Sequence, residues 1–234
     1  MAYLEGKNLV ASYGVVAILH ECSVEVEKGE LAVIVGPNGA GKSTVMRVLL
    51  GMLEPTSGSV TLNGNDISML STQDRIAQGL AFVPQTKNVF PSMTVEENLQ
   101  MGGFIREDDI SKTIEEVYEL FPILYEKRKQ LAEELSGGQR QQVAFGRAMM
   151  TRPSVMLLDE PTAGVSPIVM DEIFSNILDV RNAGMAVLMV EQNAQQALNI
   201  ADKGFVLVSG RNEHTGTGKE LIKDREVRKK FLGG

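Results

Sequence analysis

The sequence predicts an α/β protein whose core is a parallel β-sheet. Residues 31–35, 155–158 and 186–190 form short apolar runs bounded by polar or turn residues, and longer segments with helical patterns lie between such runs. A run of this length that is apolar on both faces is typical of a strand covered by helices on each side. We therefore expect these three runs in the interior of one parallel sheet.

Size and composition limit the classes of protein to which the chain can belong. Its 234 residues correspond to one large domain, or to one domain with an inserted subdomain, at ~150 residues per domain. The formal net charge of −7 argues against binding to a nucleic-acid backbone, which usually requires a basic face.

Two His and one Cys are too few for a zinc site, and lone Cys22 cannot form an internal disulfide, which indicates a reducing compartment. No apolar run approaches the ~18–20 residues that span a bilayer, and the first residues lack a secretory signal, so we expect a soluble cytosolic protein.

The segments outside the three buried runs show other patterns. Between residues 3 and 27 apolar and polar residues alternate, which predicts antiparallel strands. Residues 59–62 predict a strand that enters a tight turn at Asn63-Gly64. Residues 94–152 are charged and short of β-branched runs, so we expect a helical subdomain inserted into the sheet domain.

The C-terminal segment, residues 217–232, predicts one or two short amphipathic helices. Acidic residues interrupt its basic residues, which favours a solvated charged face over a membrane or nucleic-acid surface. The side chains expected to pack on the core are Leu221, Ile222, Val227 and Phe231.

A glycine-rich loop follows the first buried run and fits the pattern G-x-x-x-x-G-K-[ST] between a strand and a helix. It consists of Gly36, Pro37, Asn38, Gly39, Ala40, Gly41, Lys42, Ser43 and Thr44. Glycines let successive backbone N–H groups point at an anion, and the following helix adds its positive N-terminal end. Lys42 supplies a positive charge for the β- and γ-phosphates, and the Ser43 hydroxyl is a hard ligand for Mg²⁺. An incidental lysine in a glycine-rich turn is the alternative, but a random chain of this length matches the pattern only ~1% of the time. The loop therefore predicts binding of a nucleotide phosphate.

Two acidic residues follow the second buried run. Asp159 and Glu160 stand at the carboxyl end of the predicted strand, where open α/β sheets place their ligands. Asp159 fits the role of holding Mg²⁺, directly or through water, and Glu160 fits a general base that polarises the attacking water. A solvated pair that opens a loop is the alternative, and the neighbouring phosphate loop disfavours it.

A second glycine motif precedes another helical run. It consists of Leu135, Ser136, Gly137, Gly138 and Gln139. A helix N-terminus with glycines and a hydroxyl is a potential anion site, although an ordinary Ser N-cap would look the same. One phosphate loop does not need a second anion site, so the duplication calls for an explanation.

Together with the run Leu157–Thr162, the two glycine motifs resemble those of the nucleotide-binding subunits of ATP-binding cassette (ABC) transporters, and the likeness covers essentially the whole chain. The resemblance implies a P-loop NTPase (RecA-like) core with a parallel sheet, an antiparallel β-subdomain and an inserted helical subdomain. Residues 1–85 and 153–234 would form the core, and residues from about 86 to 152 the helical subdomain.

The resemblance also explains the second anion site. It implies that Leu135–Gln139 faces away from its own phosphate loop and closes on ATP bound by a second subunit, so that two chains sandwich two ATP molecules. Ser136 and Gly138 would contact the γ-phosphate in trans, and a monomer would hydrolyse ATP poorly.

Three further positions match the family pattern. Tyr13 stands where the family stacks an aromatic ring on adenine, although an ordinary edge-strand tyrosine is the alternative. Gln85 matches the glutamine that joins the core to the helical arm and would sense Mg²⁺ and the attacking water. Gln192 stands where the family commonly has His; its amide can donate to the γ-phosphate but cannot carry a proton.

Gln192, together with Ser166 in place of a usual Asp, leaves open a nucleotide-binding regulatory subunit that does not turn over. We favour activity, since Glu160 and Lys42 are both present. Soluble ABC ATPases that act on DNA or ribosomes are disfavoured, because the chain shows no long insert, no tandem cassette and no basic balance.

Residues 84–99 and 190–193 look most like the smaller ATPase of branched-chain amino acid importers. Urea or short-amide importers share these stretches, and lipopolysaccharide-export ATPases are a more distant alternative. The resemblance then implies ATP and Mg²⁺ as cofactors and a position at the cytoplasmic face of the membrane. Its implied partners are a second ATPase subunit, transmembrane permeases and, indirectly, a solute-binding protein.

Overall fold

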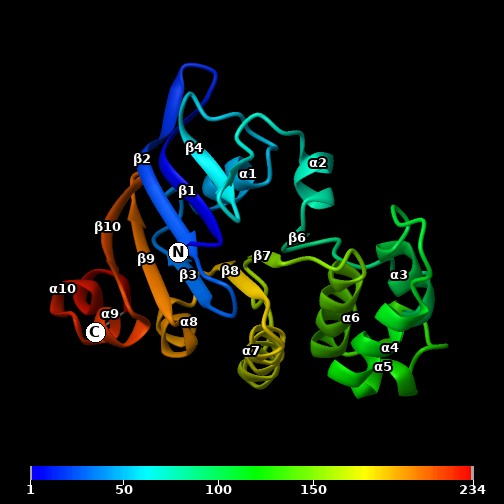
Figure 1. The fold of residues 1–234 in the computed structure, drawn as a ribbon. Helices are drawn as coiled ribbons and strands as arrows, with labels where there is room; N and C mark the ends of the chain where they lie inside the picture. Colours follow the sequence, from blue (N-terminus) through cyan, green and yellow to red (C-terminus); the bar gives the residue numbers. More distant parts are fainter. Residues whose placement is uncertain (1, 233–234) are drawn as a thin grey trace.

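The computed structural model describes residues 2–232; Met1, Gly233 and Gly234 lie outside the described residues. The strands form two sheets, a six-stranded sheet in the order β10-β9-β3-β8-β7-β6 and a four-stranded sheet in the order β2-β1-β4-β5 (Figure 1). The strands are β1 (Leu4–Tyr13), β2 (Val16–Val26), β3 (Leu31–Val35), β4 (Ser57–Leu62), β5 (Asn65–Asp66), β6 (Leu80–Val83), β7 (Val155–Asp159), β8 (Ala186–Val190), β9 (Lys203–Val208) and β10 (Arg211–Gly216).

The helices follow the strands along the chain and cover both faces of the larger sheet. They are α1 (Lys42–Leu49), α2 (Thr72–Ala77), α3 (Val95–Gly102), α4 (Ser111–Leu120), α5 (Pro122–Glu126), α6 (Gly137–Met149), α7 (Pro167–Asn182), α8 (Ala194–Ile200), α9 (Gly218–Lys223) and α10 (Arg225–Val227). A 3₁₀ turn, η1 (Ala132–Glu134), precedes α6, and a π-helical turn, η2 (Arg228–Leu232), follows α10.

The larger sheet contains the three strands predicted from the apolar runs. Strand β3 pairs in parallel with β8 and β9, β7 pairs in parallel with β8 and β6, and only the edge pair β9–β10 among the described strands of this sheet is antiparallel. The prediction of a parallel sheet is confirmed, with β7 one residue longer than expected. Because parallel strands end at the same edge, the loops after β3, β6, β7 and β8 are brought close together.

Two hydrophobic cores lie on opposite faces of this sheet, because neighbouring residues of a strand point to opposite sides. In β3, Leu31, Val33 and Val35 belong to one core, whereas Ala32 and Ile34 belong to the other. The alternation explains why the predicted strands are apolar throughout, since each residue of β3 and β8 is buried.

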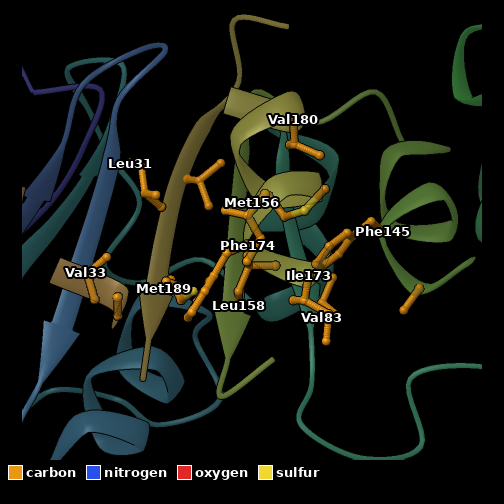
Figure 2. Close-up of a cluster of buried hydrophobic side chains, with 14 of the residues drawn as sticks. Leu31, Val33, Val83, Phe145, Met156, Leu158, Ile173, Phe174, Val180 and Met189 are labelled. Carbon is orange, nitrogen blue, oxygen red and sulfur yellow. The ribbon is translucent and has the colours of Figure 1, made fainter. Parts of the chain in front are cut away.

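Figure 2 shows the first core, where β7 meets α6 and α7. Met156 and Leu158 of β7 lie close to Ile173 and Phe174 of α7, and Phe145 of α6 belongs to the same cluster. Helices α6 and α7 therefore share one hydrophobic core with strand β7 of the larger sheet.

The second core lies between the larger sheet, α1 and the four-stranded sheet. Strands β1 and β2 are antiparallel, as predicted, with Leu4 opposite Val26. Strand β4 turns into β5 at Asn63 and Gly64, whose positive φ angles of 48° and 78° suit the tight turn expected there.

Helices α3 to α6 lie together beyond the β6 edge of the larger sheet (green in Figure 1). Thr94 begins α3 and Ser136 begins α6, each with a capping box formed with the residue three positions later. Gly102 and Gly146 permit the close contact of α3 with α6: a Cβ at Gly102 would lie 2.2 Å from the Arg147 carbonyl oxygen.

The C-terminal helices pack on the first core, as the apolar spacing predicted, and lie beside α8. Leu221 and Val227 are buried, while Ile222 and Phe231 are half-buried against the first core. The last turn is a π-helix, which the sequence pattern did not indicate.

Candidate functional site

The phosphate loop connects β3 to α1 and curves tightly because of its glycines. Gly39 and Gly41 have φ angles of 78° and 99°, which favour glycine. Gly36 has no room for a side chain, since a Cβ there would lie 2.2 Å from the Leu207 carbonyl oxygen. Gly41 is the N-cap of α1, and no side chain caps the helix, so its first backbone N–H groups are open to an anion.

A pocket of about 420 Å³ lies over this loop. It is lined by Ile18, Asn38, Gly39, Ala40, Gly41, Lys42, Ser43, Thr44 and Glu160. Most of the lining comes from the predicted phosphate loop, and Glu160 adds one of the predicted catalytic carboxylates. Ile18, from β2, was not predicted from the sequence.

Lys42 is only 5% exposed, and its ammonium group donates to the loop that carries it. Nζ lies 2.8 Å from the Gly36 carbonyl oxygen and 3.2 Å from that of Pro37. Burial lowers the pKa of Lys42, while the carboxylates of Glu160 and Asp159 act in the opposite direction. Positive charge is thus held at the base of the pocket.

Glu160 lies across the pocket from the loop and is held from two sides. Its backbone N–H donates to the Val190 carbonyl oxygen of β8 at 2.9 Å, with φ at 44°. Its Oε2 accepts a hydrogen bond of 3.0 Å from Nε2 of Gln85, which follows β6. The sheet thus brings the predicted general base and the predicted sensing glutamine into direct contact.

Asp159, at the end of β7, is half-buried next to this pair. Burial raises the pKa of the Asp159 carboxyl, the neighbouring charge of Glu160 adds to the effect, and Arg47 and Lys42 oppose it. Its Oδ1 is buried and has no hydrogen-bond partner within residues 2–232. A buried carboxylate oxygen without a partner is a candidate ligand for a cation.

The oxygens at this edge suit Mg²⁺, which prefers hard ligands and usually keeps several waters while binding to phosphates. Ser43 offers an exposed hydroxyl on the first turn of α1, Asp159 a carboxylate and Gln85 an amide. Among the described residues, no group of three or more His, Cys, Asp or Glu side chains forms a complete metal site. The donor set fits an ion that arrives together with a nucleotide.

Gln192 lies beside the first residues of the phosphate loop. Together with Gly36, Pro37 and Asn38 it lines a pocket of about 250 Å³. Lys230 and Phe231 of η2 form another wall of this pocket, a contribution of the C-terminal segment that sequence reasoning missed.

Tyr13 lies at the end of β1 and is 43% exposed. Its hydroxyl accepts a hydrogen bond of 3.2 Å from Nη1 of Arg47, on α1. Tyr13 does not line the pocket over Lys42, but this contact ties it to the helix that begins at the phosphate loop.

The second glycine motif begins α6. The Ser136 hydroxyl accepts from the Gln139 backbone N–H, and the Gln139 side chain accepts in return from the Ser136 N–H, both at 3.2 Å. A Cβ at Gly138 would lie 2.4 Å from a carboxylate oxygen of Glu172 on α7, so this glycine is closely packed. No residue of 135–139 lines the pocket over Lys42, so a single chain does not bring the two glycine motifs together there.

Within residues 2–232, no helix is long and apolar enough to cross a membrane.

Comparison with known proteins gives a consistent result. A family model described as ABC transporter matches residues 19–163. The chain is 44% identical over 223 residues to the "High-affinity branched-chain amino acid transport ATP-binding protein BraG" of Pseudomonas aeruginosa, covering 95% of this chain and 96% of that protein. It is 39% identical over 228 residues to the "Probable branched-chain amino acid transport ATP-binding protein LivF" of Archaeoglobus fulgidus, covering 97% of each chain. It is 34% identical over 237 residues to the "Lipopolysaccharide export system ATP-binding protein LptB" of Haemophilus influenzae, covering 100% of this chain and 98% of that protein.

Solved structures agree with this. The ADP conformation of an ATP-binding cassette of an ABC transporter superposes with a TM-score of 0.90 at 30% identity, and a nucleotide-free cassette with 0.88 at 30% identity; both comparisons cover 100% of each chain.

Proposed function

Because the chain belongs to the ABC transporter family of ATP-binding proteins, whose members are ATPases that power transport, we propose that it is the motor subunit of a branched-chain amino acid importer. The observation that carries the choice of solute is the 44% identity to BraG across 95% of the chain. The lower identity of 34% to LptB makes lipopolysaccharide export the weaker alternative. A urea or short-amide importer is a further alternative.

The proposed reaction is hydrolysis of ATP, and each group at the sheet edge has a role in it. The backbone N–H groups of the phosphate loop and the Lys42 ammonium bind the phosphates, and Tyr13 stacks on adenine. Glu160 accepts a proton from the water that attacks the γ-phosphorus, while the bond to the β–γ bridging oxygen breaks and ADP leaves with inorganic phosphate. The hydrogen bond from Gln85 supports this role, because an amide N–H donated to Oε2 orients the carboxylate.

The remaining polar groups act on the nucleotide and its cation. Ser43, Asp159 and Gln85 would hold Mg²⁺, which supplies positive charge to the phosphates. The Gln192 amide donates to the γ-phosphate; its place beside Gly36 and Pro37 supports this role.

The second glycine motif acts on the nucleotide of a partner subunit. Residues Leu135–Gln139 begin α6 with a positive helix end and lie outside the pocket of their own chain, which supports a two-chain sandwich. The partner is a second ABC ATPase, either a copy of this chain or a related subunit. We propose that residues from about 86 to 152 form the arm that faces the transmembrane permeases, at the cytoplasmic face of the membrane, with the rest of the chain as the nucleotide-binding core.

Glu160→Gln tests the proposed catalysis. We expect this variant to bind ATP and to dimerise, but to hydrolyse ATP at a rate lower by ~100-fold or more, because an amide cannot accept the proton. Steady-state phosphate release measures the rate, and sedimentation measures the ATP-dependent dimer. Glu220→Gln, in a capping box of α9, is the matched control. Turnover equal to wild type in Glu160→Gln would remove Glu160 from its role.

Uptake by cells tests the proposed solute. Cells that lack this chain but retain its permeases should lose uptake of labelled leucine, and the wild-type chain, but not Glu160→Gln, should restore it. Loss of urea uptake instead, or a defect in lipopolysaccharide export, would favour one of the alternatives.

A further inference from the structure

Glu191 is a buried acid next to the site to which the proposed reaction gives no role. It follows β8 directly, is 1% exposed and precedes Gln192 in the chain. A buried carboxylate is costly unless hydrogen-bond donors surround it, so its contacts indicate what it does.

The Glu191 carboxylate joins two loops through four hydrogen bonds. Oε1 accepts from the backbone N–H of Thr162 at 3.0 Å and from its hydroxyl at 2.7 Å. Oε2 accepts from the backbone N–H of Gln192 at 3.0 Å and from that of Asn193 at 3.3 Å. The Asn193 side chain closes a ring, because its Nδ2 donates to the Thr162 hydroxyl at 3.0 Å.

The backbone extends this connection to the phosphate loop. The N–H of Glu191 donates to the Ile34 carbonyl oxygen of β3 at 3.1 Å, two residues before the phosphate loop. One residue earlier, the Val190 carbonyl oxygen accepts from the N–H of Glu160. Residues 190 and 191 therefore contact the segments that carry Lys42, Glu160 and Gln192.

The ring requires an ionised carboxylate. All four groups that face the carboxylate oxygens donate, so a protonated oxygen or an amide nitrogen would meet donors instead of acceptors. Burial raises the pKa of Glu191, and the bonds from Thr162, Asn193 and Gln192 counter this effect. A glutamine has nearly the same shape but cannot satisfy both sides of the ring.

We propose that Glu191 is a positioning residue that holds the Gln192 loop and the Glu160 loop in one fixed relation, so that both side chains meet the γ-phosphate together. The inference rests on the proposed ATP hydrolysis. Glu191 does not touch the nucleotide; it acts through Thr162 and through the backbone of Gln192.

The test compares Glu191→Gln with wild type in steady-state ATP hydrolysis by the full chain, at concentrations at which it dimerises. We expect kcat to fall by ~10–100-fold, as for other small displacements of catalytic groups, while KM for ATP stays near its wild-type value because the phosphate loop is unchanged. Glu220→Gln is the matched control, since Glu220 accepts from the N–H and the hydroxyl of Thr217 in the same way but lies on α9.

A double-mutant comparison separates positioning from a general structural effect. Because Glu191 acts partly through Gln192, Glu191→Gln should lower kcat less in a Gln192→Ala background than in wild type, and the loss that remains there reports on the Glu160 loop. Hydrogen exchange of the Thr162 and Gln192 amides should also become faster in Glu191→Gln, without any nucleotide.

The possible outcomes distinguish a failure of the inference about Glu191 from a failure of the proposed ATPase. A wild-type kcat in Glu191→Gln, or losses that simply add to those of Gln192→Ala, would overturn the inference and leave the proposed ATPase intact. A wild-type chain that hydrolyses no ATP would overturn both. If Glu191→Gln does not fold, Thr162→Val replaces it, because that change removes only the hydroxyl from the ring, and the same comparisons apply.

Discussion

Substitution of Arg75, on α2, is expected to lower the stability of the fold without altering the site. Arg75 is 1% exposed, and its guanidinium donates to four backbone carbonyl oxygens. Nη1 lies 2.7 Å from the carbonyl oxygen of Val48 and 2.8 Å from the carbonyl oxygen of Leu49, both in the last turn of α1. Nη2 lies 2.7 Å from the carbonyl oxygen of Ser68, and Nε lies 3.1 Å from the carbonyl oxygen of Leu70. Carbonyls at the end of a helix have no partner within the helix, so Arg75 completes the C-terminus of the helix that starts at the phosphate loop.

We expect Arg75→Met to lower the free energy of unfolding by about 3–5 kcal/mol. Four hydrogen bonds at a net ~0.5–1.5 kcal/mol each give ~2–6 kcal/mol, and methionine keeps much of the side-chain volume, so the loss from a cavity is small. For a chain of this size each kcal/mol corresponds to ~2–4 °C, so the melting temperature should fall by ~6–20 °C. Arg75→Lys should lie between, because one ammonium cannot reach four separated carbonyls.

Thermal and urea unfolding followed by circular dichroism measure these changes, with the exposed Arg225→Met as control. At low temperature the folded Arg75→Met chain should still hydrolyse ATP, since no predicted site residue is altered. A melting temperature within 2 °C of wild type, by contrast, would refute the reasoning, because it would mean that these carbonyls find other partners at no cost.

Three further predictions concern groups in or near the site. Asp159→Asn should raise the free energy of unfolding at pH 7 by ~0.5–2 kcal/mol while impairing Mg²⁺-dependent hydrolysis. Burial and Glu160 raise the pKa of Asp159 in the folded chain, so unfolding releases a proton and the stability of the wild type falls as pH rises above ~4. The melting temperatures of wild type and Asp159→Asn should therefore converge at lower pH. Cys22 is fully buried with a pKa raised to about 12, so an aromatic disulfide reagent at pH 8 should label it only after unfolding, and rapid labelling of the native chain would contradict its burial. Gln192→Ala should reduce turnover in a phosphate-release assay if its amide contacts the γ-phosphate, whereas an unchanged rate would show that the position is passive.

The fold class follows from local patterns that the structure confirms. Residues 31–35 and 186–190 are buried throughout, as their composition requires of strands covered on both faces. The phosphate-loop pattern indicated a nucleotide-binding family, which the comparisons confirm. The roles of individual site residues stay predictions.

Other features depend on contacts between distant segments and left no local signal. Strand β6 is apolar but only four residues long, and β9 and β10 have mixed sequences; β6 and β9 join the sheet through β7 and β3, which lie far from them in the chain, so the sequence pattern did not identify them. The hydrogen bond from Gln85 to Glu160 spans 75 positions and depends on β6 lying next to β7. Arg75 and Glu191 look like ordinary surface charges in the sequence, because only the folded chain places their partners around them.

The contacts of Lys42 bear on how products leave the site. The Lys42 ammonium already donates to two neutral carbonyl oxygens of its own loop. A phosphate that binds therefore replaces existing hydrogen bonds of the lysine and does not supply its first ones. The loop consequently retains an internal substitute for the phosphate, which limits the energetic penalty of letting ADP go. We therefore expect the Lys42 contacts to moderate the affinity for ADP and so to favour its release after each round of hydrolysis.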